Sequence, residues 1–517
     1  MDESQATSRP AFTDLLLFAL AGLAVSYVAW VLWTYLRLDG YLDHMEPNIA
    51  VPAWLWLSGR PIYPAADRPI EFLTTFGPMV YLANASVFAV VGGSILSSKI
   101  GGVLASAGAL TLAVVAWRHV RPLSAVAVAA LAMAGFVLVN MPPAFWNRPD
   151  SFLLLLATVG LFLLRRVELG RPRETAAVIL GIAIGLSVNF KAHAFLYFLP
   201  AIAWFIVDER TIRGAVLTAL RIGASSVVVF LLPFALPGIS LIDYASEMLA
   251  LIPAVTHGEE VAMKVMRFSI LYLIPAAAFL LFAPSAPGRE RWRDRAYGMT
   301  FIVSLAALFY PATTTGAGTH HLMPLAPFAV DFLARLWVAE DALRTLRRIG
   351  IATFAIVVVA ISVPKQKQIH RQMDAVAARG VATDIRATLA AYPGRAIEMG
   401  YGASFDRYQD SFLRPALVFA GNPFSFEAMT FMELRNLAQE PPSAQIRRIE
   451  SCATDLWLIP KGEAPFALGS YYDGKPAFGE TLPRAFLESY EKSGSSRYFD
   501  LWSCIRGREP AGEVAPR

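Results

Sequence analysis

Asp43, His44 and Glu46 lie close together in a short segment that follows the first apolar run of the chain. Asp43 and Glu46 are three residues apart, so one helical turn would place both carboxylates on the same face. Such a carboxylate can take a proton from an acceptor hydroxyl or amine. Together with His44, the pair could instead hold a divalent metal such as Mg or Mn. The structural alternative is that an acid beside Pro47 caps a helix.

Basic side chains and histidines recur in the short turns between later apolar runs. Arginine and lysine bind phosphate groups, and aromatic rings between arginines in the first long loop suit a sugar. The residues that we expect to bind a substrate are His44, Tyr63, Arg68, Arg148, Asp150, Lys191, His193, His257, His320 and His321. These residues also have structural interpretations: Arg148 could pair only with Asp150, and Lys191 could extend to the membrane surface. Tyrosine and histidine can simply mark an interface.

The composition decides which class of protein must position these residues. The chain has 517 residues, of which 56% are hydrophobic and 16% charged, with a mean hydropathy of +0.49. These values exclude a wholly soluble enzyme, a disordered chain and a fibrous repeat. The net charge of +5 and the pI of about 9.1 come from short arginine clusters between apolar segments. Such clusters orient membrane helices, so we expect no nucleic-acid partner.

The apolar runs predict about eleven membrane spans. The first, Phe12–Leu36, is too long for a signal peptide, and no small-residue cleavage site follows it. We expect a further apolar stretch, 76–91, to lie along the membrane or re-enter, because the basic loops then all fall on the cytoplasmic side. The other predicted spans are 98–117, 123–142, 151–165, 174–188, 193–207, 214–236, 268–284, 297–311, 321–338 and 347–364.

This topology divides the chain into two predicted domains. Residues 1–364 form a transmembrane domain with a long external loop at 37–97, and residues 365–517 form a soluble α/β domain. The N-terminus is predicted to be cytoplasmic and the tail periplasmic, in a bacterial inner membrane. Cys452 and Cys504, both in the tail, are then expected to form a disulfide, with two buried free thiols as the alternative.

The order of these features resembles the membrane-embedded GT-C glycosyltransferases, such as protein mannosyltransferases and the lipid A aminoarabinose transferase. The resemblance rests on three features: the acidic motif 43–47 after the first span, the segments 59–63 and 76–81 in the long loop, and the turns at 148–150 and 318–324. It implies a polyprenyl-phosphate sugar donor, an acid of the first loop as the base, and inversion at the anomeric carbon. The base maps onto Asp43, with Glu46 as the other candidate; His44 departs from the Glu that mannosyltransferases often carry there.

The sequence therefore predicts a glycosyltransferase that moves a sugar from the carrier to a glycan, lipid or protein acceptor on the extracytoplasmic side. Lys191, Arg148 and His320 would bind the carrier phosphate. A transporter or flippase for a lipid-linked or anionic substrate is the alternative of a different class. It predicts internal repeats and polar residues in the middle of the spans, whereas most span interiors are apolar. A membrane scaffold without catalysis would tolerate the loss of Asp43.

Overall fold

The computed structural model describes residues 12–63, 74–120, 122–251, 257–283, 288–314, 316–425, 427–436 and 443–505. The chain forms two compact units, each assembled from three segments. Unit 1 comprises Met1–Leu36, Gly102–Pro233 and Thr256–Arg371. Unit 2 comprises Arg37–Gly101, Phe234–Val255 and Gln372–Arg517.

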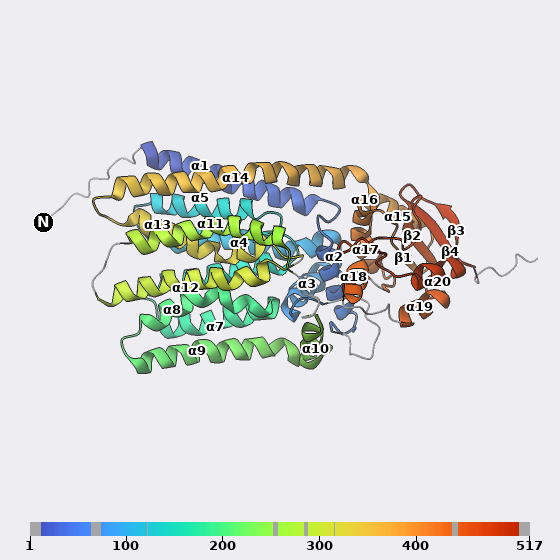
Figure 1. Cartoon of the computed structure of the whole chain (residues 1–517), viewed down its shortest axis with the longest axis horizontal. Coiled ribbons are helices and arrows are strands. Elements are labelled where there is room, and N and C mark those ends of the chain that lie inside the picture. Colours follow the sequence, from blue (N-terminus) through green and yellow to red (C-terminus); the bar gives the residue numbers. More distant parts are fainter. Residues whose placement is uncertain are drawn as a thin grey trace, which may run out of the picture. The chain divides into compact units, whose positions relative to one another are not determined.

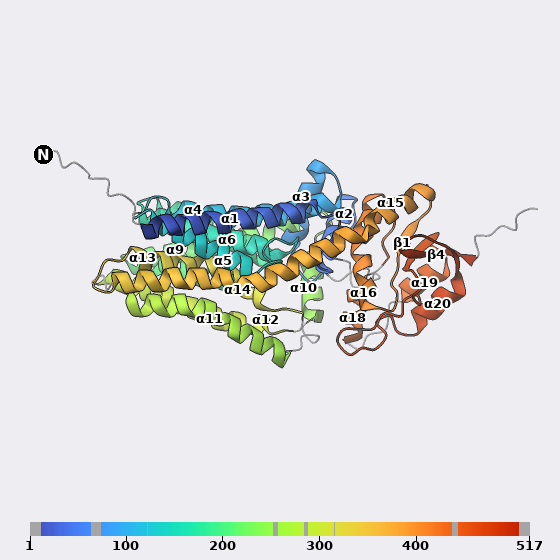
Figure 2. The same ribbon diagram turned by 90° about the horizontal axis from the view of Figure 1, so that it is seen from above.

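Unit 1 is a bundle of long apolar helices that run alongside one another (Figures 1 and 2). Its elements are α1 (Phe12–Arg37), α4 (Ile95–Trp117), α5 (Ser124–Val139), α6 (Pro149–Glu168), α7 (Arg173–Phe190), η1 (Ala192–Phe198), α8 (Leu199–Val207), α9 (Ile212–Leu231), η2 (Leu232–Ala235), α11 (Glu259–Phe282), α12 (Arg289–Ala312), η4 (Thr319–Leu325), α13 (Ala326–Val338) and α14 (Arg344–Arg379).

Six helices among the described residues are long and apolar enough to cross a membrane. They are Thr13–Arg37, Ile95–Trp117, Arg173–Phe190, Ile212–Ala235, Glu259–Phe282 and Arg344–Ala391. The other predicted spans also coincide with helical segments, but α5 and the stretch Ala192–Val207 are shorter. The polytopic α-helical character is thus confirmed, while the number of eleven spans stays a prediction.

Small residues allow a close approach between α7 and α9 in unit 1. A β-carbon on Gly181 would lie 2.4 Å from the carbonyl oxygen of Ile222, and one on Gly185 would lie 2.4 Å from that of Ser226. Glycine at both positions lets the two backbones touch, as in small-residue packing between membrane helices. One turn further on, Asn189 donates to the carbonyls of Val229 and Phe230 at 3.2 and 3.1 Å. This contact fixes the end of α7.

Unit 2 contains a four-stranded sheet with the order β1-β2-β4-β3 (Figure 1). Its strands are β1 (Ile397–Met399), β2 (Leu456–Pro460), β3 (Tyr490–Ser495) and β4 (Phe499–Cys504). β1 pairs with β2 in parallel, and β4 lies antiparallel to both β2 and β3. Side chains alternate along a strand, so Leu456 and Leu458 join one apolar core while Trp457 and Ile459 join another. The predicted C-terminal α/β part is confirmed.

The remaining helices of unit 2 come from all three of its segments. They are α2 (Met45–Leu57), α3 (Pro78–Val91), α10 (Leu241–Leu251), α15 (Val381–Ala391), α16 (Phe405–Tyr408), η5 (Gln409–Leu413), α17 (Arg414–Phe419), α18 (Ala428–Asn436), α19 (Ser443–Glu450) and α20 (Thr481–Ser489).

A buried polar contact ties the first loop to the C-terminal segment within unit 2. Arg414 donates to the side chain of Asn48 at 2.7 Å and lies 3.2 Å from the carboxylate of Glu427. Beside it, Val51 of α2 packs on Val418 and Phe424. Residues 37–101 therefore fold with the chain's last segment. The predicted domain boundary at 364/365 falls inside α14 and stays a prediction.

The predicted disulfide is present and joins Cys452 to Cys504 across 52 residues. Closing a loop of that length should stabilise the tail by about 4 kcal/mol, chiefly by restricting its unfolded chain. We expect the Cys452→Ser, Cys504→Ser double variant to unfold at a clearly lower temperature, measured by scanning calorimetry of the purified chain. An unchanged unfolding temperature would contradict a stabilising role for this bond.

Candidate functional site

Helix ends in unit 1 bring together six of the predicted site residues, which we call the Asp150 cluster: Arg148, Asp150, Lys191, His193, His320 and His321. Arg148 is the N-cap of α6, and Pro149 opens that helix with Asp150 in its first turn. Lys191 follows the last residue of α7, and His193 lies in η1. His320 and His321 belong to η4.

The carboxylate of Asp150 is the centre of the cluster. Lys191 Nζ lies 2.7 Å from Asp150 Oδ1, and Arg148 Nε lies 3.5 Å from Asp150 Oδ2. The Asp150 side chain has no exposed surface, and that of Lys191 is only 5% exposed. Two cations therefore face one carboxylate in a buried place. With neutral histidines the cluster carries a net positive charge, which favours binding of an anion.

The histidines lie close to these cations. Arg148 Nη2 is 3.4 Å from His320 Nε2, and the rings of His193 and His321 stack with centroids 5.3 Å apart. His320 and His321 also lie against each other, with ring centroids 4.8 Å apart. Their nitrogens can supply further hydrogen bonds to a bound group.

Several buried polar atoms around the cluster have no hydrogen-bond partner among the described residues. They are the side-chain oxygen and nitrogen of Asn147, Nε2 of His193, Nδ1 of His321 and the hydroxyl of Tyr197. Buried polar groups normally find a partner, so such a group points to a ligand or ordered water. The sequence-based site did not include Asn147 and Tyr197. Asn147 could have been found from its place in the Arg148 turn, whereas Tyr197 stands in an apolar run that gives no signal.

The acidic segment lies in unit 2 and largely serves to begin α2. Glu46 is fully buried, and its Oε1 accepts hydrogen bonds from the backbone N–H groups of Leu42 and Asp43 at 2.8 and 3.2 Å. Asp43 accepts one from the N–H of Met45 at 2.9 Å, and its side chain is 18% exposed. The capping alternative therefore describes Glu46 well, while Asp43 is the acid that a substrate could reach.

The carboxylates of Asp43 and Glu46 and the ring of His44, the predicted metal ligands, do not point toward one common position. Asp43 Oδ2 lies 3.6 Å from His44 Nδ1, but Glu46 turns its Oε1 to the backbone. Across the described residues, no three His, Cys, Asp or Glu side chains come together as a metal site. A divalent metal at Asp43, His44 and Glu46 stays a prediction.

The other predicted binding residues have structural contacts. Tyr63 is buried, donates to the carbonyl of Phe76 at 2.9 Å and packs on Tyr244 of α10. His257 lies 3.0 Å from the hydroxyl of Thr313. Arg68 lies outside the described residues.

Glu247 of α10 forms hydrogen bonds with the first loop. Glu247 accepts hydrogen bonds from the backbone and hydroxyl of Thr74, each at 2.6 Å. Burial raises the pKa of Glu247 to about 7. The first loop and α10 thus form one packed layer within unit 2.

Solved structures share this fold. The crystal structure of ArnT from Cupriavidus metallidurans bound to undecaprenyl phosphate matches with a TM-score of 0.53 at 13% identity, covering 96% of this chain and 99% of that one. The apo form of the same protein matches with a TM-score of 0.55 at 12% identity, covering 93% and 97%. No family model matches the sequence, and no curated protein matches it. The chain thus shares the fold of ArnT, as the resemblance predicted.

The buried pair of Asp150 and Lys191 should behave as one stabilising unit. Breaking a buried ion pair by removing one partner costs about 3–5 kcal/mol, whereas removing both partners costs much less. Arg148 stays beside Asp150 when Lys191 is removed, so the loss in that variant falls at the lower end of this range. We expect Asp150→Asn and Lys191→Met each to lower the unfolding temperature strongly, and the double variant to recover part of the loss. Thermal unfolding in detergent measures this, with Arg213→Met on exposed α9 as a control. Purely additive losses would contradict the coupling.

Proposed function

We propose that this protein is a glycosyltransferase of the bacterial inner membrane that uses a polyprenyl-phosphate-linked sugar as donor. The observation that carries the proposal is the buried, net positive Asp150 cluster in a chain with the GT-C fold. The comparison structure of ArnT holds undecaprenyl phosphate, which is a lipid of the same chemical class. A buried cation pair at helix ends is suited to a phosphate group.

In this proposal the Asp150 cluster binds the phosphate of the carrier. Arg148 and Lys191 supply the two cationic groups, and Asp150 orients them by its contacts of 3.5 and 2.7 Å. As the sugar leaves, the bond between the anomeric carbon and the phosphate oxygen breaks. Its electron pair goes to the phosphate, and the two cations stabilise the charge that develops there. The histidines can bind the remaining phosphate oxygens.

The acceptor is activated by Asp43. A hydroxyl or amine of the acceptor gives its proton to the Asp43 carboxylate and forms the new bond to the anomeric carbon. Asp43 is preferred over Glu46 because Glu46 is fully buried and caps the backbone of Leu42 and Asp43. The products are the glycosylated acceptor and the polyprenyl phosphate. We place this chemistry on the extracytoplasmic side, with the N-terminus in the cytoplasm. The acceptor is a glycan, a lipid or a protein.

The two acids provide a matched test of this assignment. Asparagine at 43 can still accept the hydrogen bond from Met45, and glutamine at 46 can still accept those from Leu42 and Asp43. We expect Asp43→Asn to lower transfer about 10²–10⁴-fold, the usual contribution of a general base, and Glu46→Gln to keep most activity. Mass spectrometry of surface glycolipids, glycans and glycoproteins, in a deletion strain complemented with each variant at equal protein level, measures this.

Three outcomes would count against the proposal. If the deletion strain loses no sugar from these glycans, the chain is not the transferase. If Asp43→Asn transfers normally, Asp43 is not the base. If a lipid-linked precursor accumulates on the inner face of the membrane in the deletion strain, the flippase alternative replaces the transferase.

A further inference from the structure

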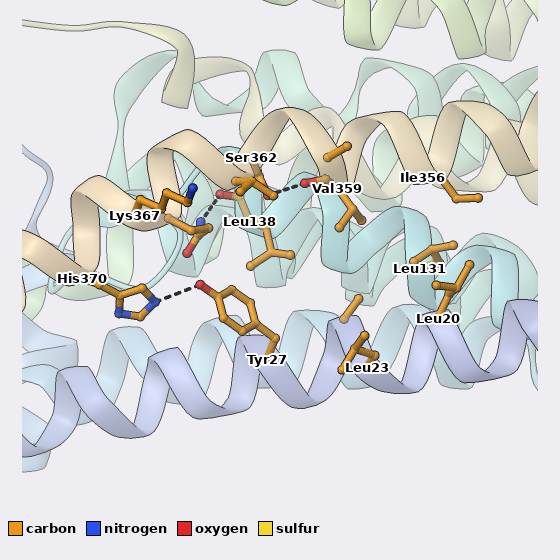
Figure 3. A pocket seen from close by; sticks show the side chains of 14 residues that line it. Leu20, Leu23, Tyr27, Leu131, Leu138, Ile356, Val359, Ser362, Lys367 and His370 are labelled. Carbon is orange, nitrogen blue, oxygen red and sulfur yellow. Dashed lines mark hydrogen bonds between the residues drawn. The ribbon is translucent and has the colours of Figure 1, made fainter.

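A groove of about 530 Å³ in unit 1 is separate from the residues of the Asp150 cluster. It lies between α1, α5 and α14, and Figure 3 shows side chains of all three helices around it. Its volume is in the range of ligand sites. The lining residues are Leu20, Leu23, Ala24, Tyr27, Leu131, Leu138, Ile356, Val359, Ala360, Ser362, Val363, Gln366, Lys367 and His370.

One end of the groove is apolar. The walls run from Leu20 to Tyr27 on α1 and from Ile356 to Val363 on α14. From the first to the last of eight residues, a helix rises about 10 Å, which is most of the roughly 15 Å depth of one bilayer leaflet. The Ser362 hydroxyl within this wall already donates to the carbonyl of Val359 at 2.7 Å. This part of the groove therefore suits a hydrocarbon chain.

The other end of the groove is polar and basic. Tyr27 and His370 share a hydrogen bond of 2.8 Å, and the Lys367 side chain is exposed beside them (Figure 3). Gln366 is 4% exposed and donates to the carbonyl of Leu138 at 2.7 Å. Its Oε1 is buried and has no hydrogen-bond partner among the described residues. A ligand here would bring an anionic group for Lys367 and a hydroxyl donor for Gln366.

We propose that this groove binds one anionic phospholipid of the surrounding bilayer, with an acyl chain along α1 and α14 and its phosphate beside Lys367. A hydroxyl of the head group, as in phosphatidylglycerol, donates to Gln366. The basic end of the groove, with Lys367 and the buried Oε1 of Gln366, favours an anionic lipid whose head group carries a hydroxyl.

The test uses the full chain in detergent, with phosphatidylglycerol and phosphatidylcholine of identical acyl chains as probes. Native mass spectrometry should show one retained phosphatidylglycerol, bound at least about fivefold more tightly than phosphatidylcholine, the effect of one cation near a membrane surface. Lys367→Glu should abolish this preference, because it places a negative charge beside the phosphate. Arg213→Glu, on exposed α9 away from the groove, is the matched control and should keep it.

A second variant tests the apolar part. Ala360→Phe adds a ring to the groove wall and should reduce retention of both lipids, with the unfolding temperature as a check on folding. Equal retention of the two lipids by the wild-type protein would overturn the proposal. So would full retention in both Lys367→Glu and Ala360→Phe. Displacement of phosphatidylglycerol by equimolar polyprenyl phosphate would assign the groove to the carrier instead.

Discussion

Burying the Asp150 carboxylate is the constraint on which the arrangement of unit 1 depends. An ionised acid with no exposed surface is tolerated only if cations and donors reach it, and these come from three different places in the chain. Lys191 comes from the end of α7 and Arg148 from the start of α6. His320, which belongs to η4, lies beside Arg148. The close packing of α7 on α9 through Gly181 and Gly185, and the Asn189 contacts at its end, hold Lys191 in reach.

The same constraint explains why the cluster can act on a ligand. Two cations against one carboxylate leave an excess of positive charge where water is scarce, and the neighbouring histidines and Asn147 retain unused hydrogen-bonding atoms. A phosphate would supply both the charge and the acceptors. The carboxylates of the acidic segment have a different role, because they accept hydrogen bonds from backbone N–H groups at the start of α2. Glu46 does so from a fully buried position, and Asp43 keeps an exposed edge.

Many helices and most residues of the candidate site could be predicted from the sequence, because hydrophobic runs and charged turns are local signals. Helix positions such as α6 and α9, the disulfide, and the residues of the Asp150 cluster follow from them. The grouping of residues 37–101 with the tail could not, because Asn48 and Arg414 meet across a separation of 366 residues. The Tyr63 hydroxyl donates to the carbonyl of Phe76 in the loop backbone, and its contact with a substrate stays a prediction. In a sequence, an aromatic residue that binds a sugar cannot be distinguished from one that packs within the fold.

The most direct measurement compares the binding of undecaprenyl phosphate and undecaprenol, which lacks the phosphate, to the purified protein. The account predicts that the wild type prefers the phosphate form and that Arg148→Gln loses most of this preference. The loss should be about ten- to a hundredfold, the usual effect of a charged hydrogen bond, with binding of undecaprenol unchanged. Equal affinity of the wild type for the two lipids, or an Arg148→Gln variant that folds and binds the phosphate form normally, would contradict the assignment of the Asp150 cluster to the carrier phosphate.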